Sequence, residues 1–235
     1  MTFVLVHGGG YDHRCWDPLL RYLPGDTVAI DLPGRGNRPA ALDTLRVSDF
    51  VDAVVDELTS RELADVVLVG HSLAGITLPG VAVRAPDRIA QLAFVSCAIP
   101  PPGTSMMAAL GDLSPAAAEL VARLGNDLVA ADGTLHPDMA RAMFCNDMDD
   151  EQFRFAIDVM VPESSSVIAE VLSGTGLPPA LPCTYVRLLQ DASLTLETQD
   201  EMLSRLGEPQ VIDLDAGHMA MITQPAALAA ILRAL

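Results

Sequence analysis

The sequence predicts an α/β protein with a mostly parallel sheet of about six strands, flanked by helices and interrupted by a helical insertion. Two observations favour this class. Short apolar, β-branched runs alternate with segments of helical spacing. These runs are apolar along their whole length, which is typical of parallel strands covered on both faces. The expected strands are residues 3–6, 27–30, 66–69, 92–95, 184–189 and 210–214.

Helical spacing follows several of these strands. It is present in residues 47–58 and in residues 72–83, which begin directly after the third strand. Residues 225–235 are expected to form the last helix. Pro225 lies in its first turn, where a backbone N–H would have no partner within the helix, so a proline is tolerated. The pattern leaves the order of the strands in the sheet open.

The segment between the fourth and fifth strands has a different character. It opens with prolines at 100–102 and closes with prolines at 178–179, and it shows no obvious strand run. We therefore expect residues 1–97 and 183–235 to form the core and residues 98–182 to form a helical cap. Helical patches occur at 115–124, 137–144, 149–159 and 164–172. Its methionines either fill gaps between helices or line a substrate pocket; they are Met106, Met107, Met139, Met143, Met148 and Met160.

Composition limits the classes of function. A chain of 235 residues, half of them hydrophobic, suits one domain with an insertion. The formal net charge of −17 disfavours nucleic acid and anionic membranes as partners. All 14 basic residues are arginine, so chemistry that needs a lysine, such as a Schiff base, is excluded.

The cysteines and the N-terminus suggest a cytoplasmic protein without a metal. The start of the chain lacks a basic region and runs directly into an apolar strand, so we expect no signal peptide. The four cysteines are scattered and form no C-x-x-C pair, so no zinc site is expected. The predicted chemistry needs no cofactor, and none is expected. The oligomeric state stays open, and a homodimer is one arrangement that the sequence allows.

Ser72 is the expected nucleophile. It lies in Gly70-His71-Ser72-Leu73-Ala74-Gly75, after an apolar strand and at the start of a helix. A sharp strand-to-helix turn exposes a serine at the carboxyl edge of a sheet, and it needs small residues two positions to either side. Ala74 stands where glycine is usual and adds one methyl group. The alternative is a serine that only caps a helix.

The expected base is His218, in the loop that follows the last strand. That loop returns to the edge of the sheet where Ser72 lies. His7 and His71 flank glycines and are interpreted as architectural or pocket-forming residues. His13 is a candidate for the pocket wall, and His136 is expected on the surface or in the cap.

The expected acid is Asp191, because it directly follows the strand at 184–189 and completes the chain order serine, acid, histidine. Its role would be to orient the imidazole and to stabilise the charged form. Asp200 and Glu201 compete, but they fall in a helical stretch. Asp213 and Asp215 belong to the last strand and its exit.

The oxyanion of the reaction needs two backbone N–H donors. We expect one at Leu73, beside the nucleophile, and the other at Gly9, with Gly8 and Gly10 as alternatives. Three consecutive glycines allow the backbone to approach a ligand closely. Other residues of these loops are expected to bind substrate: Gly8, Gly10, His13, Trp16, His71 and Met219.

These motifs together resemble the α/β-hydrolase superfamily, and within it the branch of plant methylesterases and hydroxynitrile lyases with their bacterial relatives. The resemblance covers about residues 2–100 and 182–235, and the cap is less diagnostic. The motifs are residues 3–10, Cys15-Trp16, Asp31-Leu32-Pro33-Gly34-Arg35-Gly36, Gly70 to Gly75, Gln190-Asp191 and Gly217-His218-Met219-Ala220-Met221.

The resemblance implies an esterase. The lyases of this branch carry a lysine directly after the catalytic histidine, where this chain has Met219, and a bulkier hydroxyl residue at the position of Gly8. We therefore expect hydrolysis of a small to medium apolar ester through an acyl-serine intermediate. The alternatives are a thioesterase, lactonase, acyltransferase, cyclase or decarboxylase with the same triad, a ligand-binding protein and a hydroxynitrile lyase.

Overall fold

The computed structural model describes residues 1–110, 115–174, 176–178 and 181–235. Its centre is a six-stranded sheet in the order β2-β1-β3-β4-β7-β8, in which every neighbouring pair is parallel. This confirms the predicted fold class. The strands are β1 (Phe3–Val6), β2 (Val28–Ile30), β3 (Val66–His71), β4 (Ile89–Val95), β7 (Cys183–Leu188) and β8 (Gln210–Leu214).

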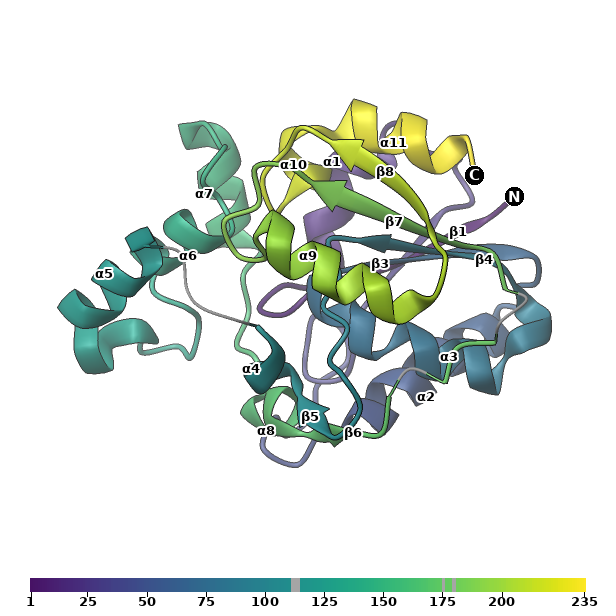
Figure 1. Cartoon of the computed structure of the whole chain (residues 1–235), viewed down its shortest axis with the longest axis horizontal. Helices are drawn as coiled ribbons and strands as arrows, with labels where there is room; N and C mark the ends of the chain where they lie inside the picture. Colours follow the sequence, from purple (N-terminus) through teal and green to yellow (C-terminus); the bar gives the residue numbers. More distant parts are fainter. Residues whose placement is uncertain (111–114, 175, 179–180) are drawn as a thin grey trace.

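Helices cover both faces of the sheet, as Figure 1 shows. Helices α1 (Asp17–Leu20), α10 (Ala220–Thr223) and α11 (Pro225–Arg233) pack on one face, and α2 (Val47–Ser60) and α3 (Leu78–Arg84) pack on the other. The side chains of β1 divide accordingly: Val4 and Val6 belong to the hydrophobic cluster with α2 and α3, whereas Phe3 and Leu5 belong to the other. Successive side chains of a strand point to opposite faces of the sheet, and helices cover both faces. Every position of the strand is therefore buried and apolar.

The insertion between β4 and β7 is mainly helical. Its helices are α4 (Met106–Ala109), α5 (Pro115–Leu124), α6 (Pro137–Met143), α7 (Asp150–Asp158) and α8 (Ser165–Ala169). A short antiparallel pair, β5 (Thr104–Ser105) and β6 (Val171–Leu172), joins its two ends. The insertion lies beyond the carboxyl ends of the strands, toward which the arrowheads of β7 and β8 point in Figure 1. Helix α9 (Leu196–Leu203) then packs beside β7.

The third strand leads into the turn that carries the expected nucleophile. Ser72 has φ of +51°, in the left-handed region that a residue with a side chain seldom adopts. A short 3₁₀ helix, η2 (Ser72–Ile76), follows, and α3 begins after Thr77. The predicted helix at 72–83 is therefore two shorter helices, because the turn needs tighter winding than an α-helix provides.

Candidate active site

Ser72, His218 and Asp191 form a continuous chain of hydrogen bonds at the carboxyl edge of the sheet. The Ser72 hydroxyl donates to Nε2 of His218 over 3.0 Å, and Nδ1–H of His218 donates to Oδ2 of Asp191 over 2.7 Å. His218 and Asp191 are 2% and 8% exposed. Three loops that are distant in sequence thus bring a serine, a histidine and a carboxylate together in the order that nucleophilic catalysis requires.

The Asp191 carboxylate is held by groups around it. Its Oδ1 accepts the backbone N–H groups of Ser193 and Leu194, over 2.7 and 2.8 Å. Its Oδ2 accepts the Ser96 hydroxyl over 2.6 Å, in addition to His218. Ser96 lies directly after β4, is fully buried and has φ of +40°. Sequence reasoning missed Ser96, because a serine after a strand has no signal that distinguishes it from a turn residue.

The backbone of His218 is held by His71. Nε2–H of His71 donates to the carbonyl oxygen of His218 over 2.9 Å, and the two rings lie 4.6 Å apart. Burial, with a contribution from the neighbouring His218, lowers the pKa of His71 well below its usual value. A neutral ring with its proton on Nε2 fits this geometry. His71 is therefore a buried support for the loop of the expected base.

His7 has a similar role at the first glycine loop. Its Nδ1–H donates to the carbonyl oxygen of Gly8 over 2.8 Å, and its Nε2 accepts the backbone N–H of Leu32 over 3.2 Å. Burial, assisted by the nearby Arg35, lowers the pKa of His7 to about 4. The ring thus stays neutral and joins the ends of β1 and β2.

A cavity of about 340 Å³ opens in front of Ser72, with Gly9 and Leu73 in its wall. A Cβ atom built on Gly9 would lie 3.2 Å from Cδ2 of Leu73, so the two expected oxyanion donors are neighbours. The N–H of Gly10 is bound to Glu163 over 2.8 Å. The rest of the wall is mainly apolar and comes from the insertion: Met106, Leu110, Val129, Leu135, Met143, Phe144, Val161 and Ile168.

The residues expected to bind substrate mostly lie elsewhere. Of the six, Gly10 lines this cavity. Trp16 and Met219 are fully buried in the cluster under α1, α10 and α11. Trp16 ends the short 3₁₀ helix His13–Trp16, and Met219 lies in the turn directly before α10. His71 supports His218, and a Cβ atom on Gly8 would lie 2.9 Å from Cβ of Ser72, so Gly8 makes room for the Ser72 side chain.

His13 also points away from the cavity. Its ring and its backbone N–H both bind Oδ1 of Asp31, over 2.8 and 3.0 Å. Asp12, His13 and Asp31 are close enough to share a cation, the one such group among the residues that the structure covers. However, both carboxylates already have hydrogen-bond partners. Asp12 accepts hydrogen bonds from Arg14, and Asp31 accepts them from His13 and from the backbone N–H of Asn37, so the geometry assigns no metal here.

Five of the six methionines named for the insertion divide between the two roles that the sequence left open. Met106 and Met143 line the cavity. Met139, Met148 and Met160 are buried in packing, and Met107 is 60% exposed. Phe144, which the sequence did not single out, stacks on the ring of His218 with centroids 5.2 Å apart.

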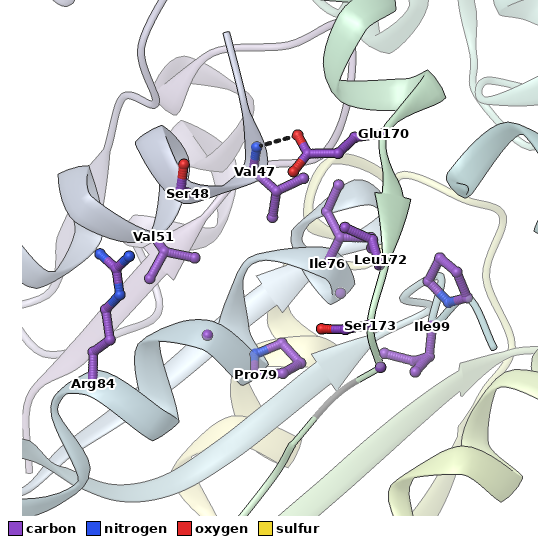
Figure 2. A pocket seen from close by; sticks show the side chains of 14 residues that line it. Val47, Ser48, Val51, Ile76, Pro79, Arg84, Ile99, Glu170, Leu172 and Ser173 are labelled. Carbon is purple, nitrogen blue, oxygen red and sulfur yellow. Dashed lines mark hydrogen bonds between the residues drawn. The ribbon is translucent and has the colours of Figure 1, made fainter. Parts of the chain in front are cut away.

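A second cavity, of about 220 Å³, lies behind the nucleophile turn (Figure 2). Gly75 and Ile76 of the turn contribute to it, together with Val47 and Leu172. Figure 2 shows the Glu170 carboxylate accepting the backbone N–H of Val47, over 2.9 Å, at the start of α2. Ser72, His218 and Asp191 do not line this cavity.

The chain is similar in sequence to a known protein family and to characterised esterases. A model of the alpha/beta hydrolase family matches residues 3–231. The chain is 27% identical to methylesterase 17 of Arabidopsis thaliana over 239 residues, which cover 95% of this chain and 87% of that protein. It is 33% identical over 113 residues to a carbendazim-hydrolysing esterase of a Nocardioides species, covering 46% and 47% of the two chains.

Solved structures show the same arrangement of elements. An extracellular alpha/beta-hydrolase from a Paenibacillus species superimposes with a TM-score of 0.82 at 22% identity, covering 99% of this chain and 97% of that chain. A methylesterase from Arabidopsis superimposes with a TM-score of 0.77 at 20% identity, covering 100% and 98%.

Proposed function

The chain belongs to the alpha/beta hydrolase family, and from this premise we propose that it is a serine esterase that cleaves a small to medium apolar carboxylic ester. The observation that carries the proposal is the hydrogen-bonded chain from Ser72 through His218 to Asp191. The similarity to methylesterase 17 and to the carbendazim-hydrolysing esterase supports ester hydrolysis as the reaction.

The mechanism follows from the positions of the three side chains. His218 accepts the proton of Ser72 through Nε2 while the Ser72 oxygen attacks the ester carbonyl, and Asp191 stabilises the imidazolium that forms. The N–H groups of Leu73 and Gly9 bind the oxyanion. Collapse of the intermediate releases the alcohol, protonated by His218, and leaves an acyl-serine. His218 then activates water, which releases the acid.

The side chains of the insertion suggest which class of substrate the cavity accepts. We propose that residues 98–182 act as a cap whose side chains form most of the cavity wall in front of Ser72. A largely apolar wall favours an apolar acyl or alcohol group. No helix in the described parts of the chain is long and apolar enough to cross a membrane. A cytoplasmic location and a small-molecule substrate complete the proposal.

Replacement of the nucleophile tests the proposal. We expect Ser72→Ala to reduce kcat for nitrophenyl acetate by at least about 10⁴-fold, because no other group can form the acyl intermediate. Circular dichroism should match the wild type. A fluorophosphonate probe should label the wild type and fail to label Ser72→Ala.

Ser48→Ala is the matched control, because Ser48 is an exposed serine on α2. It should be labelled and should turn over the ester like the wild type. An active Ser72→Ala variant, or a wild type that neither reacts with the probe nor hydrolyses esters, would contradict the proposed function.

A further inference from the structure

Glu163 is an ionisable side chain in an otherwise uncharged wall. Among the described residues that line the cavity in front of Ser72, it is the one that carries a charge. It comes from the segment between α7 and α8, and its side chain is 17% exposed. A carboxylate in an apolar cavity is unfavourable unless partners stabilise it. Its partners therefore indicate what it does.

The first partner is the glycine loop of the expected oxyanion hole. Oε2 of Glu163 accepts the N–H of Gly10 over 2.8 Å, and the N–H of Val161 donates to the carbonyl oxygen of Gly10 over 2.9 Å. Both polar backbone groups of Gly10, which has φ of +72°, are thus bound by the insertion. Holding the peptide between Gly9 and Gly10 restricts rotation of the backbone next to Gly9, the proposed oxyanion donor.

The second partner is Arg35, from the loop after β2. Its guanidinium pairs with Oε1 of Glu163, donates to the carbonyl oxygen of Pro33 over 2.8 Å and lies 4.7 Å from the centre of the Phe50 ring. The Arg35 side chain is fully buried. A fully buried cation is strongly unfavourable without a counter-charge, so this pair acts as a unit.

The charge of Glu163 lies close to the site of the reaction. A Cβ atom on Gly9 would be 3.0 Å from Oε2 of Glu163. A negative charge at this place repels the oxyanion that develops beside the Gly9 N–H, unless a nearby positive charge offsets it. Arg35 is the cation in direct contact with that carboxylate.

We propose that Glu163 is a positioning residue that orients the oxyanion loop through Gly10, and that Arg35 offsets its charge so that the oxyanion can form. This inference rests on the proposed function. It adds two residues, one from the insertion and one from the core, that act on the reaction without touching the substrate carbonyl.

A single and a double variant separate this role from simple packing. Arg35→Met keeps an apolar stem against Phe50 and leaves Glu163 as an uncompensated anion. We expect kcat for nitrophenyl acetate to fall about tenfold with little change in KM, because the repulsion exists only in the transition state. Arg35→Met/Glu163→Gln removes both charges, and the glutamine oxygen still accepts the Gly10 N–H. We expect it to recover most of the lost kcat.

The pair Arg38 and Glu57 provides the matched control. Glu57 is also 17% exposed and pairs with Arg38, but it lies on α2, outside the cavity wall. Arg38→Met and Arg38→Met/Glu57→Gln should keep the wild-type kcat. A double variant at Arg35 and Glu163 that is no more active than Arg35→Met, or an Arg35→Met variant with wild-type kcat, would overturn the inference.

Hydrogen exchange of the Gly10 amide tests the contact without turnover. The amide should be protected in the wild type and should exchange faster in Arg35→Met/Glu163→Ala, which has no acceptor. Equal protection in both would overturn the positioning role. Absence of ester hydrolysis in the wild type would instead contradict the proposed function, and this exchange measurement would still decide whether Glu163 holds the loop.

Discussion

Individual side chains support the triad through single hydrogen bonds. Ser96 donates to the same oxygen of Asp191 that receives His218, over 2.6 Å, and His71 holds the carbonyl oxygen of His218. Both supports are buried, where such bonds are strong because water does not compete. The left-handed φ of Ser96 indicates that the backbone is strained to place this hydroxyl.

Removal of the Ser96 hydroxyl should lower kcat. A hydrogen bond to a charged group contributes roughly 1.5–3 kcal/mol, so we expect Ser96→Ala to reduce kcat by roughly 10- to 150-fold with the fold intact. Steady-state hydrolysis of nitrophenyl acetate measures this loss. Ser96→Gly is the control, because it also lacks the hydroxyl but relaxes the backbone. The two variants should lose the same activity; wild-type activity in Ser96→Gly would refute the role of the hydroxyl.

The turn after β3 is the element that sets the position of Ser72, the proposed nucleophile. Its backbone is fixed to the end of β4, since the N–H of Ala98 donates to the carbonyl oxygen of Ser72 over 3.0 Å. Ala74, the irregular position of the motif, fits because Gly70 has no side chain; a Cβ atom there would lie 3.0 Å from that of Ala74. A Cβ atom on Gly75, in contrast, would overlap the carbonyl oxygen of Ala98.

Gly75 should therefore tolerate substitution less than Ala74. We expect Gly75→Ala to lower the free energy of unfolding by about 1–3 kcal/mol, because the backbone of the turn and of residue 98 must separate. Ala74→Gly should cost less than about 1 kcal/mol. Urea unfolding compares the two variants. A Gly75→Ala variant as stable as the wild type would show that the turn and the end of β4 can move apart.

At the scale of the molecule, the insertion joins the loops that carry the site. Nδ2 of Asn146 donates to the carbonyl oxygen of Gln190, and Oδ2 of Asp147 accepts the N–H of Gly217, over 2.8 and 2.7 Å. Val161 and Glu163 bind Gly10. The loops of Asp191, of His218 and of the glycines are thus each bound to the same insertion. The three loops should therefore keep their positions only while the insertion is folded.

The stability of the whole molecule should depend on pH through its buried histidines. His7 has a pKa of about 4 in the folded state and about 6.5 when unfolded, so the unfolded chain binds more protons between these values. Stability should therefore fall as pH decreases from 6.5 to 4, by up to about 1.4 kcal/mol per pH unit from His7. The pKa of His71 is lowered in the same direction and adds to the loss.

Urea unfolding at pH 7, 6 and 5 measures this dependence. His7→Asn should reduce the slope of the unfolding free energy against pH, because asparagine does not titrate in this range. The same slope in the wild type and in His7→Asn would show that His7 is not the source of the effect.

Local patterns in the chain were enough to predict the fold class and to single out Ser72, His218 and Asp191. Apolar strands, glycine turns and chain order are local signals, and parallel strands bring their carboxyl ends to one edge. Only the tertiary structure decided which neighbours support that chain of side chains. Ser96, Phe144 and Glu163 were missed, and Trp16 and Met219 were misplaced in the pocket. The direction of a side chain in a turn or on a short helix, and the packing of an insertion, depend on contacts that are distant in sequence, and local patterns do not record these contacts.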